Sequence, residues 1–172
     1  MADQKGCCCC GSNCCTPVKE KRQIVIDYLF LDLSVCTRCQ GTESALYEAI
    51  SDVEAVLNAA GFEVLVNKIH VATKEMAIAY KFESSPTIRV NGKDIDSDVK
   101  ESLCECCGDL CGENVDCRVW TYQGQEYTVP PKALIVNAIL SEVYGGGAPG
   151  REKEYALPKN LEAFYEAMDN KK

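Results

Sequence analysis

The sequence predicts an α/β fold whose core carries two cysteine-rich additions. A stretch that is apolar on both faces begins after Gln23 and is followed by apolar residues at helical spacing, as expected for a central strand and its covering helix. The same strand-then-helix order then repeats, and a hairpin signal follows. The 13 cysteines concentrate mainly outside this pattern, in residues 1–22 and 96–117.

The core is predicted to begin with two strands and two helices. Residues 24–33 ("IVIDYLFLDL") are rich in β-branched and aromatic side chains, and residues 62–71 ("FEVLVNKIHV") resemble them. Between these strands, apolar residues over 46–60 recur every three or four positions, and Gly61 provides a C-cap. A short helix over 73–82 begins with Thr73 as its cap.

Two hairpins and two helices complete the prediction. Asn91-Gly92 joins strands at 87–90 and 93–95, and Gln123-Gly124 turns a second hairpin within residues 118–129. A helix follows Pro130-Pro131, and apolar spacing predicts a last short helix near the C-terminus. We therefore divide the chain into a flexible arm (1–22), a core domain (23–143) that includes the cysteine-rich insertion 96–117, and a glycine linker with a helix (144–172).

Charge and hydropathy exclude several classes of partner. Lys plus Arg number 18 against 26 Asp plus Glu, and the formal net charge of -8 disfavours nucleic acid and anionic membranes. No apolar run is long enough for a membrane span, and the N-terminus does not resemble a secretory signal. An odd number of crowded cysteines does not suit a secreted disulfide framework, so we expect a cytoplasmic protein with metal or redox chemistry.

Cys36-Thr37-Arg38-Cys39 lies where the first predicted strand meets the first helix. Helix N-terminal amides and Arg38 both favour a thiolate at Cys36, which could attack a disulfide while Cys39 resolves the intermediate. The pair could also be half of a metal site, or chemically inert. A helix that starts at Gly41-Thr42 instead, with Thr42 as its cap, would leave Cys36 less activated.

These elements together resemble the thioredoxin-like superfamily over residues 23–143. The signatures are CTRC and Ser85-Pro86-Thr87 directly before a hairpin, although CTRC lacks the neighbouring Trp and internal Pro of many thioredoxins. The resemblance implies a three-layer fold with a central mixed sheet, a cis Pro86, and a substrate loop of Ser85, Pro86 and Thr87. With the later CxCC segment, the chain is most similar to small cysteine-rich thioredoxin-like proteins known only as a domain of unknown function.

The remaining eleven cysteines form two clusters with the chemistry of soft-metal ligands. The arm has Cys7, Cys8, Cys9, Cys10, Cys14 and Cys15, and the insertion has Cys104, Cys106, Cys107, Cys111 and Cys117. Zn(II), Cu(I), Hg(II) or As(III) could bind either cluster. The arm could instead carry exposed oxidisable thiols, and the insertion could be held by a local zinc or disulfide staple. His70, the only histidine, is expected to be an edge residue and not a ligand.

Two functions from different classes follow. The first is a thiol-disulfide oxidoreductase that needs no cofactor, in which Cys36 and Cys39 exchange with a protein partner. The second is a soft-metal or metalloid-binding protein in which the two clusters hold the ion and the α/β domain is a platform. Metal content and the state of each cysteine distinguish them.

Overall fold

A computed structural model describes residues 20–107, 115–146 and 153–171. Its main sheet has the order β2–β1–β3–β4. β1 (Arg22–Phe30) runs parallel to β2 (Phe62–His70) and antiparallel to β3 (Thr87–Val90), and β4 (Lys93–Asp94) pairs antiparallel with β3. The central position of β1 explains why its sequence is apolar on both faces.

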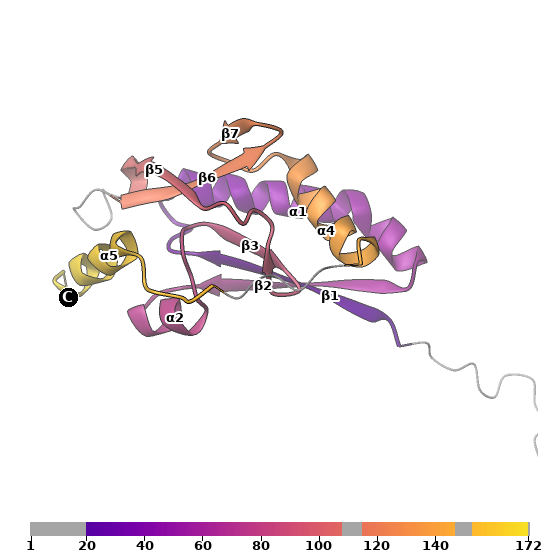
Figure 1. Cartoon of the computed structure of the whole chain (residues 1–172), viewed down its shortest axis with the longest axis horizontal. Coiled ribbons are helices and arrows are strands. Elements are labelled where there is room, and N and C mark those ends of the chain that lie inside the picture. Colours follow the sequence, from indigo (N-terminus) through magenta and orange to yellow (C-terminus); the bar gives the residue numbers. More distant parts are fainter. Residues whose placement is uncertain (1–19, 108–114, 147–152, 172) are drawn as a thin grey trace, which may run out of the picture.

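Helices cover both faces of this sheet. α1 (Thr37–Ala59) and α4 (Lys132–Tyr144) lie together on one face, and α2 (Lys74–Ala79) lies on the other (Figure 1). The core between them is aliphatic and aromatic, with fully buried side chains from β1, α1 and α4: Ile24, Ile26, Tyr28, Leu29, Leu46, Leu57, Ile135 and Ile139. This mixed α/β architecture confirms the predicted fold class and is compatible with a thioredoxin-like arrangement.

A second sheet has the order β5–β6–β7 and lies by the beginning of α1 (Figure 1). β5 (Lys100–Cys104) and β7 (Gln125–Tyr127) both pair antiparallel with β6 (Val115–Tyr122). The predicted turn at Gln123-Gly124 joins β6 and β7, and both of its residues have positive φ. β5 is a strand that the sequence did not predict, because its polar residues offer no apolar alternation.

The start of α1 decides between the two predicted helix starts. The helix begins at Thr37 with Cys36 as its N-cap, so the alternative start at Gly41-Thr42 is wrong. Thr42 is buried inside the helix and does not cap it. Gly41 packs so closely on Val129 that an added Cβ would lie 2.7 Å from a methyl group of that residue. Cys36 is thus the N-cap of α1, directly before its first turn.

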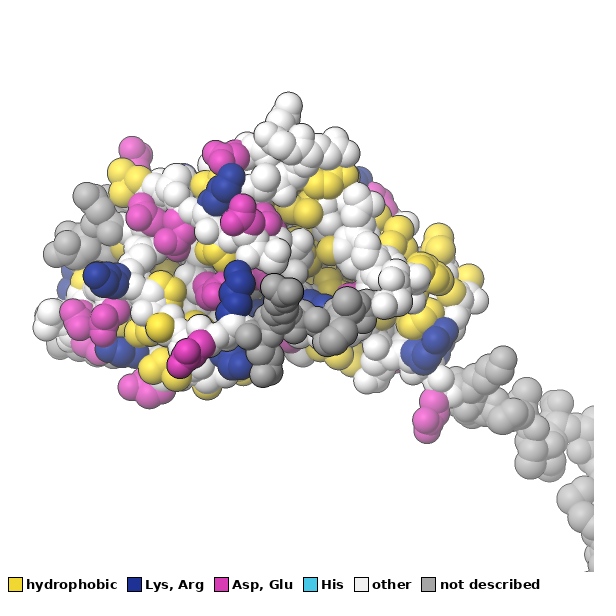
Figure 2. All heavy atoms as spheres, in the orientation of Figure 1, with side chains coloured by type: hydrophobic (Ala, Val, Ile, Leu, Met, Phe, Trp, Pro, Cys, Tyr) yellow, Lys and Arg dark blue, Asp and Glu magenta, His cyan; other side chains and the backbone are white. Residues whose placement is uncertain are grey.

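The C-terminal helix α5 (Lys159–Asp169) packs on β6 and α2. On the face shown in Figure 2, acidic and basic side chains are interspersed. Among the described residues, none of the helices is both long enough and apolar enough to span a bilayer. Most of the predicted arm (1–22) and of the predicted glycine linker lies outside the described residues.

Candidate metal centre

Four cysteine side chains converge on one buried point. The sulfur atoms of Cys36, Cys104, Cys107 and Cys117 all lie within 4.8 Å of one another, and all four residues are buried. They come from three segments of the chain. Cys36 directly precedes α1, Cys104 ends β5 and Cys107 lies in the helical turn after it, and Cys117 is near the beginning of β6. We call this set the four-cysteine centre.

Strand register explains why two of these sulfurs face the same way. In the β5–β6 ladder Cys104 is opposite Val115 and Ser102 is opposite Cys117. Cys104 and Cys117 are therefore diagonal neighbours on one face of the ladder. Their chain neighbours Leu103 and Asp116 project to the opposite face and are exposed.

Cys107 joins Cys104 through a tight turn. The two residues are separated by two positions, and residues 105–107 are helical, so the chain curls back on itself directly after β5. The Sγ atoms of Cys107 and Cys117 are 3.6 Å apart. Zn–S bonds of about 2.3 Å in a tetrahedron separate neighbouring sulfurs by about 3.8 Å. The spacing therefore suits a single tetrahedral ion.

Cys36 supplies the fourth sulfur from the N-cap position of α1. Its Sγ accepts the backbone N–H of Cys39 at 3.3 Å. Hydrogen bonds from the thiols of Cys107, Cys117 and Cys39 lower the pKa of Cys36 well below its ordinary value. The pKa of Cys117 is raised because its thiol donates to Cys107 and Cys36 and is buried. Without an ion the centre shares protons around one thiolate, and a cation can replace those protons.

Arg38 connects α1 to both strands of the centre. Its guanidinium donates to the Ser102 hydroxyl at 2.9 Å, to the Leu103 carbonyl at 2.9 Å and to the Cys117 carbonyl at 3.3 Å. The sequence predicted that Arg38 would favour a thiolate at Cys36. The contacts show a structural role, because they fix the two cysteine-bearing strands β5 and β6 on the helix that follows Cys36.

Cys39 lies outside the four-cysteine centre. It is fully buried, and its Sγ is 3.5 Å from the Ser85 hydroxyl. Its backbone carbonyl accepts the Tyr28 hydroxyl at 2.6 Å. The structure therefore brings Cys36 together with Cys104, Cys107 and Cys117, and it places the Cys39 side chain against the loop that carries Pro86.

The Ser85–Pro86 peptide bond is cis, and the loop that contains it is occupied by the protein's own chain. The Ser85 carbonyl accepts the backbone N–H of Arg118 in β6 at 2.8 Å. Thr87 is also buried and donates to the Ser84 carbonyl at 2.6 Å. The surface predicted to meet a substrate is thus covered by β6.

Among the described residues, the other predicted site residues take no part in the centre. Cys106 is half-buried, with its Sγ 3.6 Å from the Thr37 hydroxyl. Cys111 and the six arm cysteines lie outside the described residues. His70 lies at the end of β2 and stacks on Phe30. The sequence signal that could have singled out Cys104 and Cys107 is their CxxC spacing, which the intervening Cys106 obscures.

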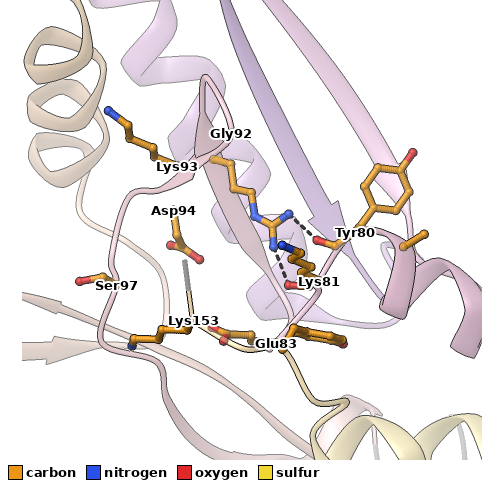
Figure 3. A pocket seen from close by; sticks show the side chains of 11 residues that line it. Tyr80, Lys81, Glu83, Gly92, Lys93, Asp94, Ser97 and Lys153 are labelled. Atoms are coloured by element: carbon orange, nitrogen blue, oxygen red, sulfur yellow. Dashed lines mark hydrogen bonds between the residues drawn. The ribbon is translucent and has the colours of Figure 1, made fainter. Parts of the chain in front are cut away.

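A separate cavity of about 620 Å³ contains no cysteine (Figure 3). Arg89 crosses it and donates to the carbonyls of Tyr80 and Lys81 at 2.6 and 2.8 Å. Lys93 and Asp94 also line it, and each is already in an ion pair, with Glu142 and Arg118 respectively. This cavity therefore offers no thiol or imidazole.

Comparison with known proteins gives one match. A family model described as a domain of unknown function (DUF2703) matches residues 23–139, which include the whole four-cysteine centre. No curated protein and no solved structure matches the chain.

Proposed function

The chain belongs to the DUF2703 family, and we propose that it is a metal-binding protein that holds one soft divalent ion, Zn²⁺ in the first instance, in its four-cysteine centre. The observation that carries the proposal is the convergence of four buried sulfurs from three chain segments. Four thiols brought this close in a buried site are stabilised when a cation replaces their protons.

Zinc suits the number and the arrangement of the ligands. Tetrahedral four-sulfur sites are typical of zinc or iron, whereas Cu(I), Hg(II) and As(III) are also bound well by fewer thiolates. Because all four positions are filled by protein and buried, the ion has no open position for a substrate. The centre therefore retains a metal and does not use it as a Lewis acid.

Protein thiol-disulfide exchange has less support. It requires a sulfur that a partner can reach, but Cys36 and Cys39 are both 0% exposed. The loop of Pro86 is covered by β6 as well. We therefore propose a metal ion as the partner, with neither nucleic acid nor membrane involved. A reducing compartment such as the cytoplasm keeps the thiols able to bind it.

The test is metal analysis of the full-length chain in which the six arm cysteines are replaced by serine. We expect one zinc ion per chain after anaerobic purification, and thiolate-to-metal absorption when Co²⁺ replaces zinc. Cys117→Ser should lose the ion. Cys39→Ser and Cys106→Ser, which remove cysteines outside the centre, should keep it. Absence of metal from the parent chain, or retention in Cys117→Ser, would contradict the proposal.

A further inference from the structure

Cys39 is a buried thiol in direct contact with one metal ligand. It follows Cys36 by three residues in the first turn of α1, and its amide donates to the Cys36 sulfur at 3.3 Å. Its side chain is fully buried. Cys39 is thus a buried thiol held against a ligand without being one.

On the premise of the proposed function, we infer that Cys36 has two alternative partners and that peroxide switches between them. In the reduced protein Cys36 binds the metal with Cys104, Cys107 and Cys117. In the oxidised protein Cys36 forms a disulfide with Cys39, and the centre, left with three ligands, releases its ion. The protein then acts as a peroxide-triggered source of metal.

The chemistry balances with hydrogen peroxide as the oxidant. The Cys36 thiolate attacks one peroxide oxygen, the O–O bond breaks, and a sulfenic acid and hydroxide form. The Cys39 sulfur then attacks the Cys36 sulfur, the S–O bond breaks, and the departing hydroxide takes the thiol proton as water. Two electrons pass from the two sulfurs to peroxide. A thiol reductant then reduces the Cys36–Cys39 disulfide to two thiols by thiol–disulfide exchange and becomes a disulfide itself.

Exposure around Cys36 favours a small oxidant. Its neighbours Val35 and Thr37 are both exposed, although the Cys36 side chain itself is not. Because both chain neighbours of Cys36 reach the surface, a molecule as small as peroxide is the oxidant best able to approach it. A protein disulfide is much larger and is excluded by the covering strand β6.

The competing disulfide joins Cys107 and Cys117, whose sulfurs are 3.6 Å apart. Both of these are ligands, so their oxidation breaks two metal–sulfur bonds. Oxidation of Cys36 with Cys39 breaks only one, since Cys39 is outside the centre. Cys36 and Cys39 are also one helical turn apart, which is the CxxC spacing at which two cysteines commonly form a disulfide.

The experiment uses the full-length, zinc-loaded chain with its arm cysteines changed to serine, treated with hydrogen peroxide. Zinc release is followed with a chromogenic chelator, and disulfides are mapped by mass spectrometry after alkylation. We expect release together with a Cys36–Cys39 disulfide, and recovery of zinc binding after reduction. Cys39→Ser should release zinc at least about tenfold more slowly. Cys106→Ser, the matched control, should behave like the parent.

Several results would overturn this inference. One is release from Cys39→Ser at the parent rate, and another is a disulfide that maps to Cys107 and Cys117. Mapping in the parent chain decides the matter even if the Cys39 variant folds poorly. A failure of the proposed function is seen separately, because the chain would then hold no zinc before peroxide is added.

Discussion

The two sheets of the protein are stabilised by different forces. In β1 the fully buried side chains include Ile24, Ile26 and Leu29, which pack into an apolar core. In β6 the fully buried side chains are Val115, Cys117, Arg118 and Trp120. The main sheet is therefore held by hydrophobic burial, whereas the second sheet adds sulfur, charge and hydrogen bonds to its apolar contacts.

This difference shows where the protein can respond to its surroundings. Hydrophobic packing changes little with metal or oxidant, but a thiolate centre changes with both. A four-stranded scaffold thus stays folded while the region attached to it gains or loses an ion. We therefore expect metal and oxidant to affect the second sheet while the main sheet stays folded.

Loss of a ligand should affect the second sheet alone. In Cys117→Ser, as after chelation of the parent, we expect tight zinc binding to disappear and amide exchange in β5 and β6 to rise by about a hundredfold or more. Exchange in β1 and β2 should change little, because these strands hydrogen-bond within the main sheet and not to β5 or β6. Hydrogen-exchange mass spectrometry measures amide exchange in both sheets. Equal acceleration in the two sheets would show that they do not respond independently.

Arg118 is the main polar link between the sheets. Its buried guanidinium pairs with the Asp94 carboxylate at 2.8 Å, donates to Thr87 at 3.0 Å and lies over the Trp120 ring. Arg118→Met leaves the partly buried Asp94 without its ion-pair partner, so we expect a loss of about 3 kcal/mol in the free energy of unfolding, measured in urea.

Arg89 is the matched control, because among the described residues its guanidinium donates to the backbone carbonyls of two exposed residues, Tyr80 and Lys81. Arg89→Met should cost about 1 kcal/mol. Similar losses for the two arginines would mean that the polar link is not what joins the sheets.

Arg38 positions the strands that carry the centre. Arg38→Ala removes hydrogen bonds to Ser102, Leu103 and Cys117, so we expect a loss of about 2 kcal/mol in stability and weaker zinc binding in chelator competition. The solvent-exposed pair Lys132–Asp52 is the comparison, and Lys132→Ala should leave stability and zinc affinity nearly unchanged. Unchanged zinc affinity in Arg38→Ala would limit this residue to a role in stability.

Tyr165 gives a pH test outside the centre. Its hydroxyl donates to the Val71 carbonyl at 2.8 Å, and burial raises its pKa above the ordinary 10.0. Above pH 10 the unfolded chain therefore releases a proton that the folded chain keeps, and stability falls as the pH rises. Tyr165→Phe should cost about 1 kcal/mol near neutral pH and reduce this alkaline loss.

Urea unfolding at neutral and alkaline pH measures both effects of Tyr165→Phe. Tyr144 is exposed and provides the control, since Tyr144→Phe should leave stability and its pH dependence unchanged. An undiminished alkaline loss in Tyr165→Phe would assign that loss to another group.

Local pattern was sufficient for most elements of the main sheet. The double-sided apolar run of β1, the helical spacing of α1 and the turn at Asn91-Gly92 each depend on residues close in sequence. β5 was missed because KESLC has no apolar alternation, and it becomes a strand only through its pairing with β6. Strand pairing over a distance leaves little trace in one strand's own residues.

By itself, the sequence determined the mixed α/β fold and placed Cys36 and Cys39 between the first strand and the first helix. Only the tertiary structure decided which sulfurs act together, because Cys36 and Cys117 are separated by most of the core domain and meet through the docking of β6 beside α1. Local spacing reports the partners that a cysteine has along the chain. The partners it has in space depend on how whole elements pack, and that packing placed Cys39 outside the centre.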